Sequence, residues 1–311
     1  MELGHTLERI VMREKFLSEL VERISNWPEV VAVAEGGSQA KGNQDQASDL
    51  DLYIYVHSEV PFVKRSMLID LRSDNAELDN RIWEIADEWT DSSTGMVVDM
   101  MYRSPDWIER ELARVLDSHE SSPGYSTCHW ENVRSSRVLF DPTGWYRKLK
   151  LKAARPYPGE LARSIFEKNY RLLCDTHSAF QKQILTAASR NDSVSVNHRT
   201  AAFLACYFDV LFALNRVPHP GEKRLLDSSG SLEFVPTALR DDVQALMSAG
   251  SRNEATELKK ILDRMVTELD LCLRASVLRN LAPLKRDFPQ SVSRDKPGHS
   301  VEHSPRRTIC R

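Results

Sequence analysis

The spacing of apolar positions in the first part of the chain predicts one helix followed by strands. From Thr6 to Trp27 apolar residues recur at the spacing of an amphipathic helix, and Pro28 ends the pattern. The stretch Val30–Val56 then begins with an apolar run, crosses a polar loop and ends in strict alternation. We expect a strand, a tight turn, a loop and a second strand in this stretch.

Further along, the pattern continues to mix strands and helices. Met96–Tyr102 predicts a third strand, and Arg137–Phe140 predicts a short one. Between them, Pro105–Val115 predicts a helix with Ser104 as its N-terminal cap. The segment Arg72–Thr90 also carries periodic apolar residues, but its pattern fits a helix, strands or both.

A cluster of helix-breaking residues at Arg155–Gly159 marks a change in the pattern. After this cluster the apolar positions follow helical spacing almost throughout, which is typical of a helical bundle. The predicted helices are one long helix at Glu160–Arg190, a strongly apolar one at Ser195–Val217, and further helices at Thr237–Ala249 and Asn253–Asn280.

These patterns predict the α+β fold class. We expect a small mixed-sheet domain at residues 1–150 and an all-α helical bundle domain at residues 155–283. A length of 311 residues is consistent with two domains. The tail at residues 284–311 is rich in Ser, Pro and basic residues but has few apolar ones, so we expect it to be disordered.

Composition and charge narrow the classes of function. The chain is 41% hydrophobic and 28% charged with a net charge of -3, which gives no general electrostatic case for a nucleic-acid partner. No apolar run approaches the length of a membrane span, and no signal pattern is seen, so a cytoplasmic location is expected. The five cysteines include no Cys-x-x-Cys pair, which favours neither a zinc site nor a disulfide framework.

Candidate chemistry lies in the second strand and in the turn before it. Alternation places Asp49 and Asp51 on one face of that strand, where paired carboxylates suit a hard divalent cation. An isolated Asp-x-Asp is also typical of a solvated edge strand. The preceding Gly37 and Ser38 favour the catalytic interpretation, because glycine lets backbone approach a ligand closely and exposed amides with a hydroxyl suit a phosphate.

The combined motif resembles that of the DNA polymerase beta nucleotidyltransferase superfamily. Gly37-Ser38-Gln39-Ala40-Lys41-Gly42 and the later Ser48-Asp49-Leu50-Asp51 nearly match Gly-Ser-x-Ala-Arg-Gly and Ser-Asp-Leu-Asp. These motifs occur in stand-alone, two-domain bacterial members, including those that adenylylate aminoglycoside and lincosamide antibiotics. Lys41 stands where Arg is usual, so the positive charge is kept but bidentate phosphate contact is lost.

The resemblance implies a nucleotidyltransferase domain that moves a nucleoside monophosphate, AMP from ATP, to a hydroxyl of a small-molecule acceptor and releases pyrophosphate. It further implies that Asp49, Asp51 and Asp99 are catalytic and hold two Mg²⁺ ions, with Asp99 also helping to deprotonate the acceptor. The NTP-binding residues would be Gly37, Ser38, Lys41 and Lys223.

Several alternatives stay open at this point. Glu84 and Asp87 are reserve carboxylates, whereas Asp141 is more typical of a turn than of a metal ligand. The loop Leu214–Arg224 is either a solvated connection or a segment that faces the catalytic cleft, where Lys223 would neutralise triphosphate. A toxin–antitoxin component or a nucleotide-binding module acting on tRNA or a protein would use the same core. The acceptor and the oligomeric state are not determined by the sequence.

Overall fold

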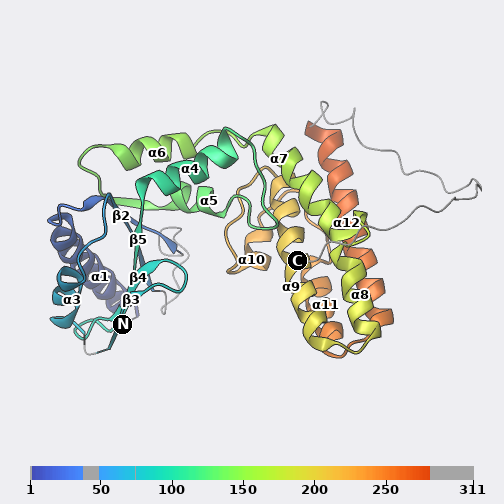
Figure 1. The fold of residues 1–311 in the computed structure, drawn as a ribbon, viewed down its shortest axis with the longest axis horizontal. Helices are drawn as coiled ribbons and strands as arrows, with labels where there is room; N and C mark the ends of the chain where they lie inside the picture. Colours follow the sequence, from blue (N-terminus) through green and yellow to red (C-terminus); the bar gives the residue numbers. More distant parts are fainter. Residues whose placement is uncertain (1, 38–48, 74, 281–311) are drawn as a thin grey trace, which may run out of the picture.

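The computed structural model of the protein describes residues 2–37, 49–73 and 75–280 (Figure 1). Ser38, Lys41 and the tail at residues 284–311, for which the sequence makes predictions, lie outside the described residues. The described part is an N-terminal mixed sheet with helices on both faces, followed by a helical region. This arrangement confirms the α+β fold class.

The sheet has six strands in the order β3-β4-β5-β2-β1-β6. Strands β2 and β5 run parallel, whereas the other described pairings are antiparallel. In the described residues of the segment that the sequence left open, there are two strands and no helix, because β4 pairs with β5 and β3 pairs with β4. The strands are β1 (Val30–Glu35), β2 (Leu50–Val56), β3 (Ala76–Asn80), β4 (Ile85–Thr90), β5 (Val97–Arg103) and β6 (Arg137–Phe140).

Alternation along β2 sorts its side chains onto two faces, as the sequence predicts. Leu50, Leu52 and Ile54 are buried against α1 (Glu2–Ser25) and α3 (Phe62–Asp70), which lie together on one side of the sheet (Figure 1). Burial of each such aliphatic side chain contributes about 1.5–3 kcal/mol. Burial of this apolar face therefore fixes the register of β2.

The opposite face of β2 carries Tyr53 and Tyr55, which pack into a second core. That core is covered by α4 (Pro105–Leu116), α5 (Cys128–Ser135) and α6 (Trp145–Ala153). It also takes in Leu161 of α7 (Gly159–Ile165) and Ala213 of α9 (Ser193–Leu214), so the helical region packs directly onto the helices above the sheet. The second core therefore joins the sheet to the helical region.

Two local predictions concern the start of α4 and the turn at Asp141. Ser104 occupies the N-cap position of α4 and Pro105 begins the helix, as predicted, although the Ser104 side chain makes no capping hydrogen bond. The turn at Asp141 is confirmed, because its carbonyl oxygen accepts from the Gly144 amide and its Oδ2 accepts from the Arg147 amide at 2.9 Å.

The prediction of one long helix at residues 160–190 is wrong. The segment contains α7, a π-helix η1 (Phe166–Asp175) and α8 (Phe180–Ser189). The break follows Asp175, where Thr176 is extended with φ -126° and ψ 165°. The polar run Asp-Thr-His-Ser there offers the backbone local turn contacts in place of helical ones.

The remaining helices confirm the predicted bundle. Helix α9 lies at its centre and buries Phe203, Tyr207, Leu211 and neighbouring apolar residues. Among the described helices, none combines the length and apolarity needed to cross a bilayer. The other helices of the bundle are α10 (Leu225–Ser229), α11 (Leu239–Ser251) and α12 (Ala255–Asn280).

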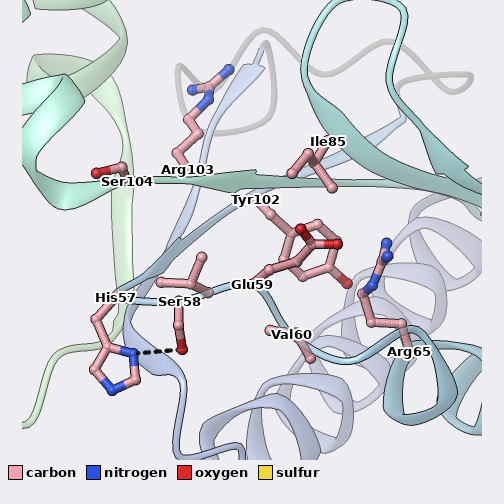
Figure 2. Close-up of a pocket in the computed structure, with 10 residues that line it drawn as sticks. His57, Ser58, Glu59, Val60, Arg65, Ile85, Tyr102, Arg103 and Ser104 are labelled. Carbon is pink, nitrogen blue, oxygen red and sulfur yellow. Dashed lines mark hydrogen bonds between the residues drawn. The ribbon is translucent and has the colours of Figure 1, made fainter.

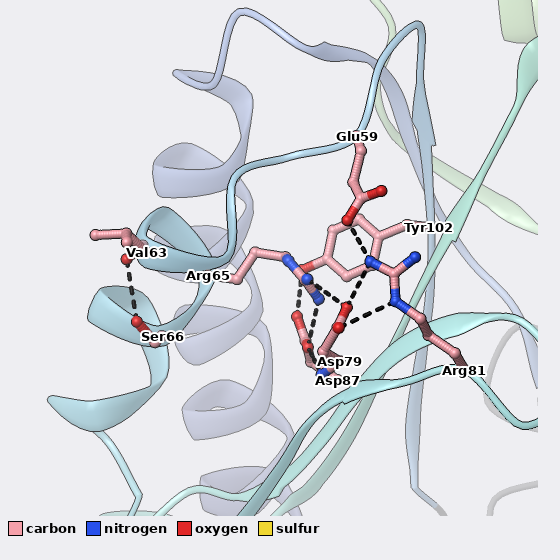
Figure 3. A network of polar contacts seen from close by, with 8 residues as sticks. All are labelled: Glu59, Val63, Arg65, Ser66, Asp79, Arg81, Asp87 and Tyr102. Atoms are coloured by element: carbon pink, nitrogen blue, oxygen red, sulfur yellow. Dashed lines mark hydrogen bonds and ion pairs between the residues drawn. The ribbon is translucent and has the colours of Figure 1, made fainter.

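A buried ion-pair network fastens α3 to the strands at the β3–β4 edge (Figure 3). Arg65 is only 1% exposed and donates to Asp87 Oδ1 at 2.7 Å and to Asp79 Oδ1 at 2.8 Å. The Tyr102 hydroxyl donates to the second oxygen of Asp87 at 2.9 Å. The network thus connects α3 with β3, β4 and β5. Arg65, Asp87 and Tyr102 are buried, whereas Asp79 is partly exposed.

We expect Asp87→Ala to destabilise the protein by about 3–5 kcal/mol, because it leaves the buried Arg65 without its closest partner. Urea unfolding measures the change. The matched control is Glu254→Ala, which removes a pair with Arg252 whose side chains are 54% and 42% exposed and which should therefore change the stability far less. Equal costs for the two variants would contradict the stabilising role of the network.

Candidate active site

The central feature of the candidate site is the register between β2 and β5. In this parallel pair Asp51 lies directly beside Asp99. Neighbouring strands lie about 4.8 Å apart, and residues in register point to the same face. Both carboxylates are half-buried. The structure therefore brings together two of the three carboxylates that the sequence predicts for the site.

The electrostatics of the pair show that negative charge is crowded here. Burial raises the pKa of Asp99 to about 6, and the charge of Asp51 and then of Glu88 adds to this rise. Burial also raises the pKa of Asp51, with Asp49 adding to the shift and Lys223 opposing it. A cation bound between these groups would relieve the repulsion.

The third predicted carboxylate, Asp49, is exposed and stands immediately before β2. In the part of the chain that the structure describes, no three carboxylate, imidazole or thiol side chains form a ready metal cluster. The residues present fit a hard divalent ion in their chemistry, because all are carboxylate oxygens that crowd one another. The side chains would converge further around such an ion.

The glycine pair lies against the carboxylate strand, as the motif predicts. The Gly36 amide donates to the Asp51 carbonyl oxygen at 2.9 Å. Gly37 has a φ of 69°, and a Cβ placed on it would collide with the Asp51 Oδ2 atom. Glycine is therefore needed at position 37 for two reasons: the backbone has a positive φ, and a side chain would collide with the carboxylate.

Lys223 comes from a distant part of the chain, the loop between α9 and α10. Its positive charge is the strongest influence that opposes the burial effect on the pKa of Asp51. Its side chain is exposed. The structure thus places the helical region's predicted phosphate-binding lysine within electrostatic reach of the carboxylate pair.

Sequence reasoning missed two neighbours of the pair, one on β4 and one on β5. Glu88 of β4 lies directly opposite Asp99. Arg103, at the end of β5, donates to both oxygens of Glu84 at 2.7 Å and lies 4.1 Å from the Tyr53 ring centre. Alternation would have placed Glu84 and Glu88 on one face, had the segment been assigned as a strand.

Of the two reserve carboxylates, Glu84 lies on the Asp99 side of the sheet and is bonded to Arg103. Asp87 lies on the other side, where it is fully buried and bonded to Arg65. Asp87 therefore stabilises the sheet and does not join the carboxylates of the candidate site.

Two hollows elsewhere in the described structure are separate from the carboxylate pair. A cavity of about 220 Å³ lies at the carboxyl ends of β2 and β5, lined by His57, Tyr102 and Ser104 among others (Figure 2). A wider hollow of about 920 Å³ lies between the loop at Ser121 and Lys168 of η1. Neither Asp51 nor Asp99 lines them.

A mixed sheet that carries paired carboxylates on neighbouring strands, with a glycine turn against one of them, offers the groups that metal-assisted phosphoryl or nucleotidyl transfer uses. Comparison with family models agrees, because residues 14–117 match the nucleotidyltransferase domain. This range runs from α1 to the end of α4 and includes Asp49, Asp51 and Asp99. The chain therefore carries a polymerase beta-like nucleotidyltransferase domain at residues 14–117, which supports a nucleotidyltransferase enzyme and implies an NTP substrate.

The other comparisons add little. Among solved structures, a nucleotidyltransferase-like protein from Exiguobacterium sibiricum 255-15 is similar to this chain with a TM-score of 0.40 and 13% sequence identity. That match covers 83% of this chain and 73% of the other, and a likeness of this strength carries nothing further about the site. Comparison with curated proteins gave no match.

We expect Gly37→Ala to weaken Mg²⁺-dependent NTP binding by about tenfold or more, which is a loss of about 1.4 kcal/mol, because the new methyl group displaces the Asp51 carboxylate. Calorimetric titration measures the affinity. Gly95→Ala is the matched control, since Gly95 has a φ of 70° but nothing within 4 Å of the position that the new methyl group would occupy. Both variants carry backbone strain, and only the first should lose affinity.

Proposed function

We propose that this protein transfers a nucleoside monophosphate, AMP from ATP, to a hydroxyl group of a small-molecule acceptor and releases pyrophosphate. The observation that carries the proposal is the register of Asp51 beside Asp99 on the carboxylate face. The Gly37 turn supports it, because its backbone lies against one of the two carboxylates. ATP is chosen because it is the usual donor in the family that the motif resembles.

Asp49, Asp51 and Asp99 would hold two Mg²⁺ ions, for which their oxygen donors and crowded negative charge are suited. Bound Mg²⁺ supplies neutralisation of the phosphate charge that builds up during transfer. The Gly37 turn, with Ser38 and Lys41 beyond it, would hold the outer phosphates of the NTP.

The reaction needs a proton acceptor and a charge partner besides the metal ligands. Asp99 would take the proton of the acceptor hydroxyl, whose oxygen then bonds to the α-phosphorus as the bond from that phosphorus to pyrophosphate breaks. Its raised pKa, caused by burial and like charges, gives it a stronger basicity than an ordinary carboxylate. Lys223 would face the negative charge that accumulates on the leaving pyrophosphate.

The acceptor class follows from the charges beside Asp99. Glu88 lies opposite it on β4 and is exposed, while Glu84 farther along the strand is engaged by Arg103. An acidic strand beside the proton acceptor favours a small cationic molecule with hydroxyl groups and disfavours an RNA backbone. We therefore propose a cationic acceptor of the aminoglycoside type.

The first experiment titrates each of the four NTPs into the protein with and without Mg²⁺. We expect Mg²⁺-dependent binding of one NTP, and loss of that binding in Asp51→Asn, because the carboxylate pair is broken. The control is Asp241→Asn, an exposed position in α11 that should behave as the native chain. If Asp51→Asn bound the NTPs as tightly as the native chain does, the proposed site would be contradicted.

The acceptor class is tested by pyrophosphate release with cationic aminoglycosides, neutral sugars and tRNA. We expect release with a cationic compound, and a KM for it that rises about two- to fivefold in Glu88→Gln, since an exposed charge contributes about 0.5–1 kcal/mol. Glu257→Gln, exposed on α12, is the control. A preferred neutral acceptor, or a KM that is unchanged in Glu88→Gln, would contradict the cationic class.

A further inference from the structure

Lys223 is an exposed residue on a loop of the helical region, and its charge reaches Asp51 of the sheet. The loop at residues 215–224 follows α9 and precedes α10. Figure 1 shows α10 on the side of the helical bundle that faces the sheet. A lysine side chain has many rotamers, so the region that its charge can reach depends on how firmly its backbone is held.

The loop is fastened where it leaves α9. Asn215 accepts from the Phe234 amide at 2.8 Å through Oδ1 and donates to the Phe234 carbonyl at 2.9 Å through Nδ2. Arg216 then takes a φ of 57°, and its side chain donates to the Pro158 carbonyl at 3.0 Å. These contacts fix the direction in which the loop starts toward the sheet.

The middle of the loop is fastened by His219, whose side chain is fully buried. Its backbone amide donates to Thr127 Oγ1 at 2.7 Å, and its Nδ1 accepts from the Gly221 amide at 3.1 Å. The ring lies between Tyr125 and Phe212, each with its ring centre 5.1 Å away. Burial lowers the pKa of His219 to about 4, so the ring stays neutral and Nδ1 remains an acceptor near neutral pH.

Thr127 is itself held in place by the neighbouring residue. The Ser126 amide donates to Asp209 Oδ1 at 3.0 Å, and the Ser126 hydroxyl donates to Asp209 Oδ2 at 2.6 Å. Asp209 belongs to α9 and is 1% exposed. A continuous set of buried hydrogen bonds therefore runs from α9 through the segment before α5 to His219, four residues before Lys223.

We propose that Thr127 and His219 are positioning residues that hold the loop so that Lys223 faces the triphosphate of an NTP bound at the carboxylate site. This inference rests on the proposed function. The two residues touch neither the substrate nor the carboxylates, and they act only through Lys223. An alternative in which they serve stability alone predicts no effect on nucleotide affinity at temperatures where the variants are folded.

The test compares Thr127→Val, which keeps the size but removes the hydroxyl that accepts from His219, with Thr127→Ser, which keeps the hydroxyl. The probes are ATP with Mg²⁺ and inorganic tripolyphosphate with Mg²⁺, titrated by calorimetry. We expect both probes to bind about fivefold more weakly to Thr127→Val and almost normally to Thr127→Ser. Lys223→Gln should weaken both probes by about tenfold, which corresponds to 1.4 kcal/mol.

The double variant Thr127→Val/Lys223→Gln decides between positioning and independent effects. If Thr127 acts through Lys223, the double variant binds as Lys223→Gln alone does, because the lysine charge is already gone. Losses that multiply in the double variant, or a Thr127→Val protein with native affinity, would overturn the inference while the proposed function stands. A native chain that binds neither probe would instead overturn the proposed function, and this inference with it.

A second pair of variants covers the case in which Thr127→Val does not fold. His219→Asn keeps an acceptor near the Nδ1 position, whereas His219→Phe keeps the ring but removes the acceptor for the Gly221 amide. We expect only His219→Phe to weaken probe binding to about the same extent as Thr127→Val. A native affinity in His219→Phe, or an equal loss in both His219 variants, would count against a hydrogen bond that positions Lys223.

Discussion

The register of β2 beside β5 is the constraint on which the site depends, because it places two carboxylates side by side in a half-buried position. Two like charges about 4.8 Å apart repel by roughly 3 to 4 kcal/mol at an effective dielectric constant of about 20. The apolar residues on the reverse face, Leu50, Leu52 and Val98 among them, bury against α1 and α3 and offset this cost. The core beneath the sheet thus maintains an arrangement that the carboxylates alone would oppose.

Charged groups around the sheet are of two kinds: those held in ion pairs, and acids that can still bind a ligand. Arg65 is enclosed and neutralised by Asp79 and Asp87, and it fastens α3 to the edge strand β3, whose residues are exposed or only partly buried. Arg103 is likewise engaged, by both oxygens of Glu84. Such charges are committed to the fold. The groups left for chemistry are the acids whose pKa values are raised by burial and mutual repulsion.

The sequence was sufficient where one periodicity dominated a segment. Strict alternation identified β2 and its carboxylate face, and the apolar run Met96–Tyr102 identified β5, with Asp99 as its single acid. The β3–β4 segment was ambiguous because its apolar residues suit either period, and Glu88 was missed with it. Helices α5 and α6 were missed because they are short and rely on packing against the tyrosine face. The break at Thr176 was missed because amphipathic spacing continues on both sides of it.

The origin of Lys223 in the helical region has a physical explanation. A cation placed on the sheet beside Asp51 and Asp99 would pair with them permanently, as Arg13 and Arg137 do with the buried Glu35, and it would no longer be free to meet a phosphate. A lysine carried on a separate loop stays exposed and interacts with Asp51 only through its field. A side chain on a loop is positioned less precisely than one on a strand, because loops are more mobile. The buried contacts of Asn215, Thr127 and His219 restore that precision while leaving the charge available.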